Sequence, residues 1–211
     1  MTHSRFTRIT KITLLCVLAA AANRGLNILS IDVLQIPLFL DTVFTAAVSF
    51  TAGIVPGLFT ALLTQAGASI WEGNVNPFVL CSFTEVLLIC WLNPLAVKKQ
   101  TPGGSFVKSR SRAAAVMVSI FASLLLLYIV SCLAISVLGG LIDFVYYGVL
   151  SMPKAYFSAE DAFKISLLQS SFPPLTINIL ARIPVNIVDR FVVIFGGFFI
   201  SRGLKKFYDM C

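Results

Sequence analysis

The chain has 211 residues, of which 58% are hydrophobic and 12% are charged. A soluble domain of this length has about 45–50% apolar and about 25% charged residues, so the composition excludes an ordinary soluble protein. The net charge of +7 is compatible with nucleic-acid binding, but the basic residues stand in short clusters between long apolar runs. Such clusters are typical of the loops of a helical membrane protein, and we expect one integral membrane domain over residues 1–211.

Six apolar segments follow one another along the chain, and each predicts a membrane-spanning helix. Their approximate bounds are 11–30, 37–52, 54–70, 77–96, 113–139 and 174–202. Within the mixed run 140–170, Ser158 with Asp161 at the third helical position predicts a short capped helix, re-entrant or on the surface. The expected fold class is an all-α membrane protein with six transmembrane helices.

The lysine and arginine residues predict the orientation of these spans. With six spans, eleven of them fall on one side of the membrane, whereas the loops of the other side hold Lys154 and Lys164. The eleven are Arg5, Arg8, Lys11, Lys98, Lys99, Lys108, Arg110, Arg112, Arg202, Lys205 and Lys206. The positive-inside rule then places both termini and the basic loop 97–112 in the cytoplasm of a multi-pass cell-membrane protein.

The first segment allows two interpretations. Its basic start, its apolar stretch from Ile12 to Ala22 and its alanine-rich end are also typical of a cleavable signal peptide. The apolar character continues through "GLNIL" to the length of a full span, which favours a retained helix.

Several ionisable residues lie within the predicted spans. A charge near the bilayer centre costs about 2.5–3.5 kcal/mol on insertion scales, so such residues usually face the bundle interior. They are Arg24 in the first span, Glu85 in the fourth, and Asp189 and Arg190 in the sixth, with Asp41 in the outer third of the second. We expect a buried ion network, for example Arg24 with Glu85 or Asp189.

The sixth predicted span has a polar face. Arg182 and Asn186 are four residues apart and the pair at 189–190 follows one turn later, so these side chains share one side of a helix. Asn178 extends the line, and Pro184 frees a backbone carbonyl and favours a kink. We expect Asn178, Arg182 and Asn186 to line a solute site that opens outward, with a purely structural ion network as the alternative.

The predicted outer loop "IWEGNVNPF", residues 70–78, is the second candidate for solute binding. Trp71 would stack on a ligand ring, and Glu72, Asn74 and Asn76 would orient the ligand. The alternative is that Trp71 only anchors the chain at the membrane interface.

The first predicted span has two pairs of small residues spaced by four, Cys16–Ala20 and Ala21–Gly25. Small pairs of this kind allow another helix to approach closely in lipid. They predict either packing within the protein or a docking face for another membrane subunit.

No motif predicts catalysis, a cofactor or a metal site. The sequence has no Walker A, kinase, zincin or GxSxG pattern, and Glu85 with Asp189 lacks an accompanying nucleophile. The five cysteines are scattered and His3 is the only histidine, so no metal-ligand spacing occurs. We therefore expect neither an enzyme nor a bound cofactor.

The layout resembles the substrate-binding S component of energy-coupling factor (ECF) vitamin transporters. The likeness is carried by six short spans, an alanine-rich first helix after a basic start, the hairpin "PLFLDTVFTAAVSFTAGIVPGLFTALL" and the final helix "IPVNIVDRFVVIFGGFFI". It covers most of the chain.

The resemblance implies a capture subunit that binds a vitamin or related micronutrient near the outer surface. Such a subunit docks on a transmembrane T subunit and two ATPases, topples in the lipid bilayer and releases the solute inside; it binds no nucleic acid. The family's docking signature is Ala-xxx-Ala in helix one, to which Cys16–Ala20 is nearest here. Arg182 would suit a carboxylate or phosphate on the ligand. Arg24 departs from the family pattern, which indicates either a divergent member or the alternative of a sensor or assembly protein that does not transport.

Overall fold

The computed structural model describes residues 2–34, 38–73, 75–93, 109–152, 159–169 and 171–209. Every regular element within these ranges is helical, and no strand occurs in them. The helices are α1 (Thr2–Ile28, continued by the π-helical turn Leu29–Val33), α2 (Val43–Ala52, preceded by the 3-10 turn Leu40–Thr42), α3 (Ile54–Glu72), α4 (Val79–Trp91), α5 (Ser109–Asp143, continued by the π-helical turn Phe144–Val149), α6 (Ala159–Leu167), α7 (Pro174–Phe191) and α8 (Gly197–Asp209), the last two joined by the π-helical turn Val192–Gly196.

Three helical stretches in the described part of the chain are long and apolar enough to cross a membrane. They are Ile9–Ile31, Ala114–Val149 and Pro174–Lys205. The shorter apolar helices are Leu40–Ala52, Ile54–Ile70 and Val79–Trp91. Large apolar side chains also face outward, Trp91 being 81% exposed and Ile70 84% exposed. An all-helical protein suited to lipid, as the composition predicts, is therefore what the chain forms.

The helices differ from the predicted segments in two places, at the fifth helix and at the last. The fifth is longer than predicted, because its apolar run continues past residue 139 as far as the turn ending at Val149. The predicted short helix is α6, which begins at Ala159 and packs against α7; its predicted cap Ser158 and residues 97–108 of the basic loop lie outside the described residues. The last helix continues through Pro184, and the turn with wider spacing comes eight residues later.

Close packing between helices uses glycine at several contacts. On α5, a Cβ built on Gly140 would lie only 2.7 Å from the Ile179 Cα of α7. On α8, a Cβ on Gly197 would lie 2.8 Å from the Ala46 Cβ of α2. These two contacts join α5 to α7 and α2 to α8, so the last helical stretch has one glycine contact near its start, at Ile179, and another where α8 begins, at Gly197.

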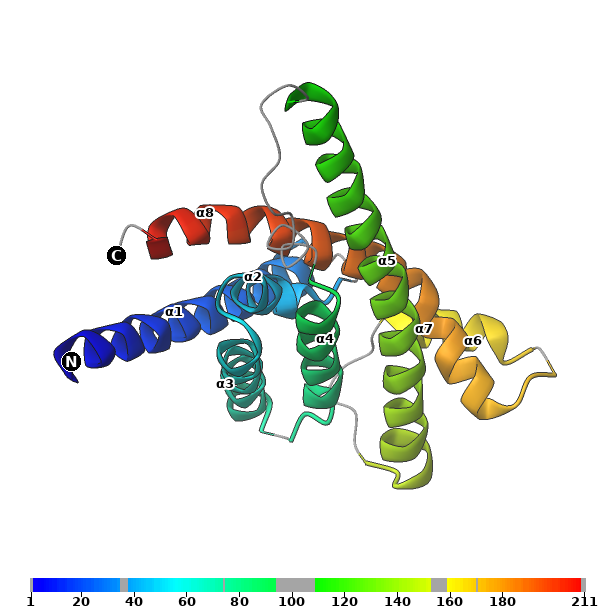
Figure 1. The fold of residues 1–211 in the computed structure, drawn as a ribbon. Coiled ribbons are helices and arrows are strands. Elements are labelled where there is room, and N and C mark those ends of the chain that lie inside the picture. The colour runs from blue at the N-terminus through cyan, green and yellow to red at the C-terminus, as the bar shows by residue number, and fades with distance from the viewer. Residues whose placement is uncertain are drawn as a thin grey trace.

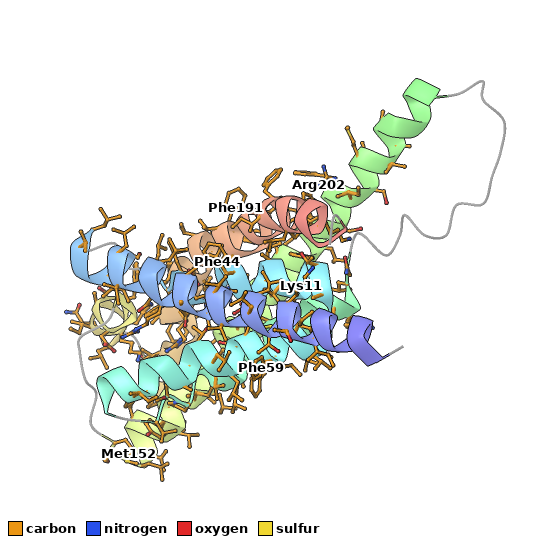
Figure 2. The ribbon with its side chains drawn as sticks, turned by 90° about the vertical axis from the view of Figure 1, so that its left-hand side faces the viewer. Lys11, Phe44, Phe59, Met152, Phe191 and Arg202 are labelled. Carbon is orange, nitrogen blue, oxygen red and sulfur yellow. The ribbon has the colours of Figure 1, made fainter. Side chains whose placement is uncertain are left out.

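The ends of the chain lie on the same side of the molecule (Figure 1). Figure 2 shows Lys11 and Arg202 toward one end of the bundle and Met152, which follows α5, at the opposite end. Helix α5 packs against both α4 and α7 (Figure 1). This group, together with α2 and α3, contains the buried polar residues described next.

Candidate functional site

The most deeply buried charges form an ion pair network between α4 and α7. Arg190 donates from Nη1 to Glu85 Oε2 and from Nη2 to Asp189 Oδ2. All three residues are at most 4% exposed. A lone charge at such a place would be strongly unfavourable, so the mutual pairing is what allows these residues to occupy the apolar interior.

A second group of polar side chains extends this network toward α2 and α3. Gln65 donates from Nε2 to Asp41 Oδ2 at 2.8 Å and to Ser82 Oγ at 3.3 Å. Ser82 lies on α4 one turn before Glu85. We call the set Asp41, Gln65, Ser82, Glu85, Asp189 and Arg190 the central cluster. Sequence reasoning did not select Gln65 or Ser82, although Gln65 is the one amide within the third predicted span.

Several oxygens at the central cluster have no hydrogen-bond partner in the described structure. They are Glu85 Oε1, Asp189 Oδ1, Gln65 Oε1 and the Oγ1 of Thr42, which adjoins Asp41. Gln65 and Thr42 are each 4% exposed. One donor, Arg190 Nε, is also unpartnered. Buried polar atoms are normally hydrogen-bonded, so these atoms are exceptions within the described part of the bundle.

The second ion network, the α6 cluster, consists of the buried Asp143 and Arg182 and the partly exposed Asp161 and Lys164. Arg182 Nη2 lies 3.2 Å from Asp143 Oδ2, and Lys164 Nζ lies 2.5 Å from the same oxygen and 3.3 Å from Asp161 Oδ1. The Arg182 guanidinium also stands 4.5 Å from the centre of the Phe78 ring, a cation–π contact. This cluster ties α6 to α5 and α7 and contains two cations and two carboxylates.

On the predicted polar face of the last span, Arg182 and Asn186 are buried and Asn178 is partly exposed, and the described partners of all three belong to the protein. Arg182 pairs with Asp143, and Asn186 donates to Ser136 Oγ on α5 at 2.9 Å. Asn178 donates to the Pro174 carbonyl of its own helix at 2.9 Å. Arg182 and Asn186 therefore contact α5, as a structural ion and hydrogen-bond network would, and the predicted role of this face in solute binding stays a prediction.

The predicted solute loop is only partly described. Helix α3 continues to Glu72, so Trp71 and Glu72 are helical; their side chains and the whole of Asn74 lie outside the described residues. Asn76 accepts from the Phe78 backbone N–H at 3.0 Å, and its own N–H donates to Ser69 Oγ at 3.2 Å. Asn76 therefore shapes the turn that leads into α4.

The expected ion network of Glu85 and Asp189 has Arg190 as its described cation. Arg24 donates to Asn27 Oδ1 of its own helix at 3.1 Å, whereas Arg190 is the cation on Glu85 and Asp189. The neighbouring Asn23, which sequence reasoning passed over, is fully buried. It donates to the hydroxyls of Thr45 and Thr64 and accepts from the Phe44 backbone N–H, so it joins α1, α2 and α3.

The small residues of α1 divide between the two sides of the helix. Cys16 is fully buried and its thiol donates to the Pro56 carbonyl at 3.6 Å, and Ala20 is 8% exposed. The predicted docking pair Cys16–Ala20 is therefore used for packing inside the protein. Ala21 and Gly25, the other small pair, lie on the exposed side.

The chemistry available to the central cluster and the α6 cluster is the recognition of a charged group. Among the described residues, no group of three His, Cys, Asp or Glu side chains has the placement of a metal site. The described cysteines Cys16, Cys81, Cys90 and Cys132 are free thiols. A scan against protein-family models and searches of curated proteins and of solved structures returned no match for the chain.

Proposed function

We propose that the chain is the solute-capturing S component of an ECF-type importer in the cell membrane. In this proposal six helical segments cross the bilayer, α6 lies at the outer surface, and both termini are cytoplasmic. The solute is a vitamin or related micronutrient taken from outside. A separate T subunit and two ATPases supply the coupling, because the sequence contains no nucleotide-binding motif.

The arrangement of the helix ends supports this topology. Lys11 and Arg202 lie toward one end of the bundle, and Met152 lies at the other (Figure 2). Basic residues near the ends of spans are characteristic of the cytoplasmic side. With that orientation, Gln65 and Ser82 belong to the outer halves of α3 and α4, Asp41 lies in the turn before α2, and Glu85 is at the middle of α4.

The observation that carries the proposal is the central cluster itself. Glu85, Asp189 and Arg190 are almost completely buried in a bundle whose outer surface is apolar. Ionisable residues at membrane depth are costly, and they commonly mark a path or site for a solute or ion. The unpartnered oxygens beside them add the unsatisfied hydrogen-bonding capacity that such a site needs.

The alternative function is an S-component-like sensor or assembly protein that does not transport. Arg24, within the first helix, is the feature that favours it. The two functions differ in their partners, because an importer requires ATPases and a sensor does not.

Affinity purification of the full chain in mild detergent distinguishes the two. For an importer we expect a T subunit and two ATPases to co-purify, and the purified complex to hydrolyse ATP, which the isolated chain does not do. Recovery of the chain with signalling proteins and without ATPase activity would support the sensor instead.

A second prediction concerns docking on α1. A Cβ on Gly25 meets nothing within 4 Å, so Gly25→Leu leaves internal packing intact while filling the exposed small-residue face. If the T subunit packs there, we expect this variant to lose the co-purified subunits, since small residues are what let helices approach in lipid.

The matched control for this change is Gly67→Leu on α3, where a Cβ also meets nothing within 4 Å. It should retain the subunits. Equal recovery of subunits with Gly25→Leu and Gly67→Leu would show that docking uses another face.

A further inference from the structure

The two ion networks differ in their charge balance. The α6 cluster pairs two cations, Lys164 and Arg182, with two carboxylates, Asp143 and Asp161. The central cluster holds the three carboxylates of Asp41, Glu85 and Asp189, and the cation that the described structure places among them is Arg190. When ionised, these groups leave an excess of two negative charges.

The central cluster also has more unpartnered hydrogen-bond acceptors than unpartnered donors. Glu85 and Asp189 each keep one oxygen without a donor, and so does the nine-tenths-buried amide of Gln65. Two hydrogen bonds from Gln65 Nε2, to Asp41 and Ser82, hold the Gln65 amide beside these residues. The unpartnered acceptors outnumber the unpartnered donors, which are Arg190 Nε and the Thr42 hydroxyl. A group that brings N–H donors and positive charge would satisfy both deficits.

Neither arginine is available as a primary site for an anion. Arg190 is occupied by Glu85 and Asp189, and Arg182 lies against Asp143 and the Phe78 ring. An anionic solute would have to displace a buried carboxylate from its guanidinium, which leaves an uncompensated charge in the interior. The expectation that Arg182 attracts a carboxylate or phosphate is therefore disfavoured by its surroundings.

The geometry also favours an organic cation over a metal ion. The acidic and amide oxygens come from α3, α4, α7 and the turn before α2, and no three His, Cys, Asp or Glu side chains among the described residues converge as metal ligands. A metal ion needs its ligands within about 2.0–2.6 Å. An organic ammonium or amidinium group with several N–H donors can reach acceptors that are spread more widely. Asp41 is partly exposed, whereas Gln65, Glu85 and Asp189 are at most 4% exposed.

We propose that the central cluster is the binding site of a small organic cation, recognised through its N–H donors by Asp41, Gln65, Glu85 and Asp189. This inference rests on the proposed function and names the class of its solute. It assigns Arg190 a positioning role: the guanidinium holds Glu85 and Asp189 side by side so that each presents its second oxygen.

The test uses three probes of the same size that differ in charge: benzylamine as its ammonium form, benzyl alcohol and benzoate. Their effect on the thermal unfolding of the full chain in detergent is measured at constant ionic strength. We expect benzylammonium to raise Tm in a saturable manner, with little effect of the alcohol and none of benzoate. Stabilisation of a native state by a ligand reports binding directly.

The variant Asp41→Asn provides the second readout. It keeps the side chain's shape and an oxygen that can accept from Gln65, but removes one negative charge. We expect about tenfold weaker binding of benzylammonium, the change that corresponds to loss of one charge-assisted contact. Asp161→Asn is the matched control, because it makes the same chemical change in the α6 cluster, and its affinity should equal that of the unaltered chain.

Several outcomes would overturn the cation assignment. They are stabilisation by benzoate equal to that by benzylammonium, no stabilisation by benzylammonium, unchanged affinity in Asp41→Asn, or the same shift produced by sodium or magnesium chloride alone. The result is independent of the co-purification experiment. A protein that selects benzylammonium but brings down no ATPase refutes the importer function, whereas an importer that prefers benzoate refutes only the cationic solute.

Discussion

Replacing Arg190 by methionine is expected to destabilise the protein by about 3–5 kcal/mol, the usual cost of removing one partner from a buried ion pair. Methionine has a similar length, so the loss of charge dominates over the loss of volume. Glu85 and Asp189 would remain buried without their shared cation. Unfolding by sodium dodecyl sulfate in mixed micelles, followed by circular dichroism, measures the change in free energy.

Two further variants separate charge from packing in this experiment. Arg202→Met makes the same replacement at an exposed position on α8 and should have a small effect. Adding Glu85→Gln and Asp189→Asn to Arg190→Met removes both orphaned carboxylates and should recover part of the lost stability. If Arg190→Met unfolds at the same detergent concentration as the unaltered chain, the network is not what organises the bundle interior.

The second large effect is expected at the contact between α5 and α7. Gly140→Leu places a side chain where the first carbon alone would approach the Ile179 Cα at 2.7 Å and its N at 2.8 Å. Overpacking against movable side chains costs about 1–3 kcal/mol, and here the obstacle is backbone, so we expect at least the upper end of that range. Fluorescence-detected size-exclusion chromatography after heating reports the loss as a lower midpoint of aggregation.

Gly203→Leu is the control for that substitution, because a Cβ at Gly203 on α8 meets nothing within 4 Å. Leucine is also the better helix former, so this variant should be neutral or slightly more stable. Equal midpoints for Gly140→Leu and Gly203→Leu would mean that α5 and α7 can separate without loss of the fold.

The helices could be predicted from the sequence because the hydrophobic requirement of the bilayer acts locally. Long apolar runs predict spans wherever they occur, and the spacing of Arg182, Asn186 and Asp189 predicts a shared face by helical periodicity alone. All three are buried in the structure. The longer fifth helix was missed because the polar Asp143 and the glycines before it mimic the end of a span.

The partners within the site could not be predicted in the same way. Hydropathy gives the depth of a residue in the membrane, but the rotation of its helix depends on contacts with distant segments. The sequence predicts comparable membrane depths for Arg24 and Arg190. Only the packing of α4 against its neighbours decides which of the two contacts Glu85. Gln65 and Asp41 are 24 residues apart, and their hydrogen bond depends on the hairpin between α2 and α3.

The number of residues in the π-helical turn Val192–Gly196 sets the rotation of α8 relative to α7. Each residue turns an α-helix by about 100°, so removal of one residue from this turn would rotate α8 by about that angle relative to α7. Gly197 would then leave Ala46, and the buried Phe198 would turn away from Phe50, whose ring it now meets edge-on at 5.7 Å. Substitutions in this turn can keep the rotation of α8 relative to α7, whereas deletion of a single residue cannot. The charged residues of α7 and the face of α8 that packs on α2 therefore keep their relative directions only if the number of residues stays the same.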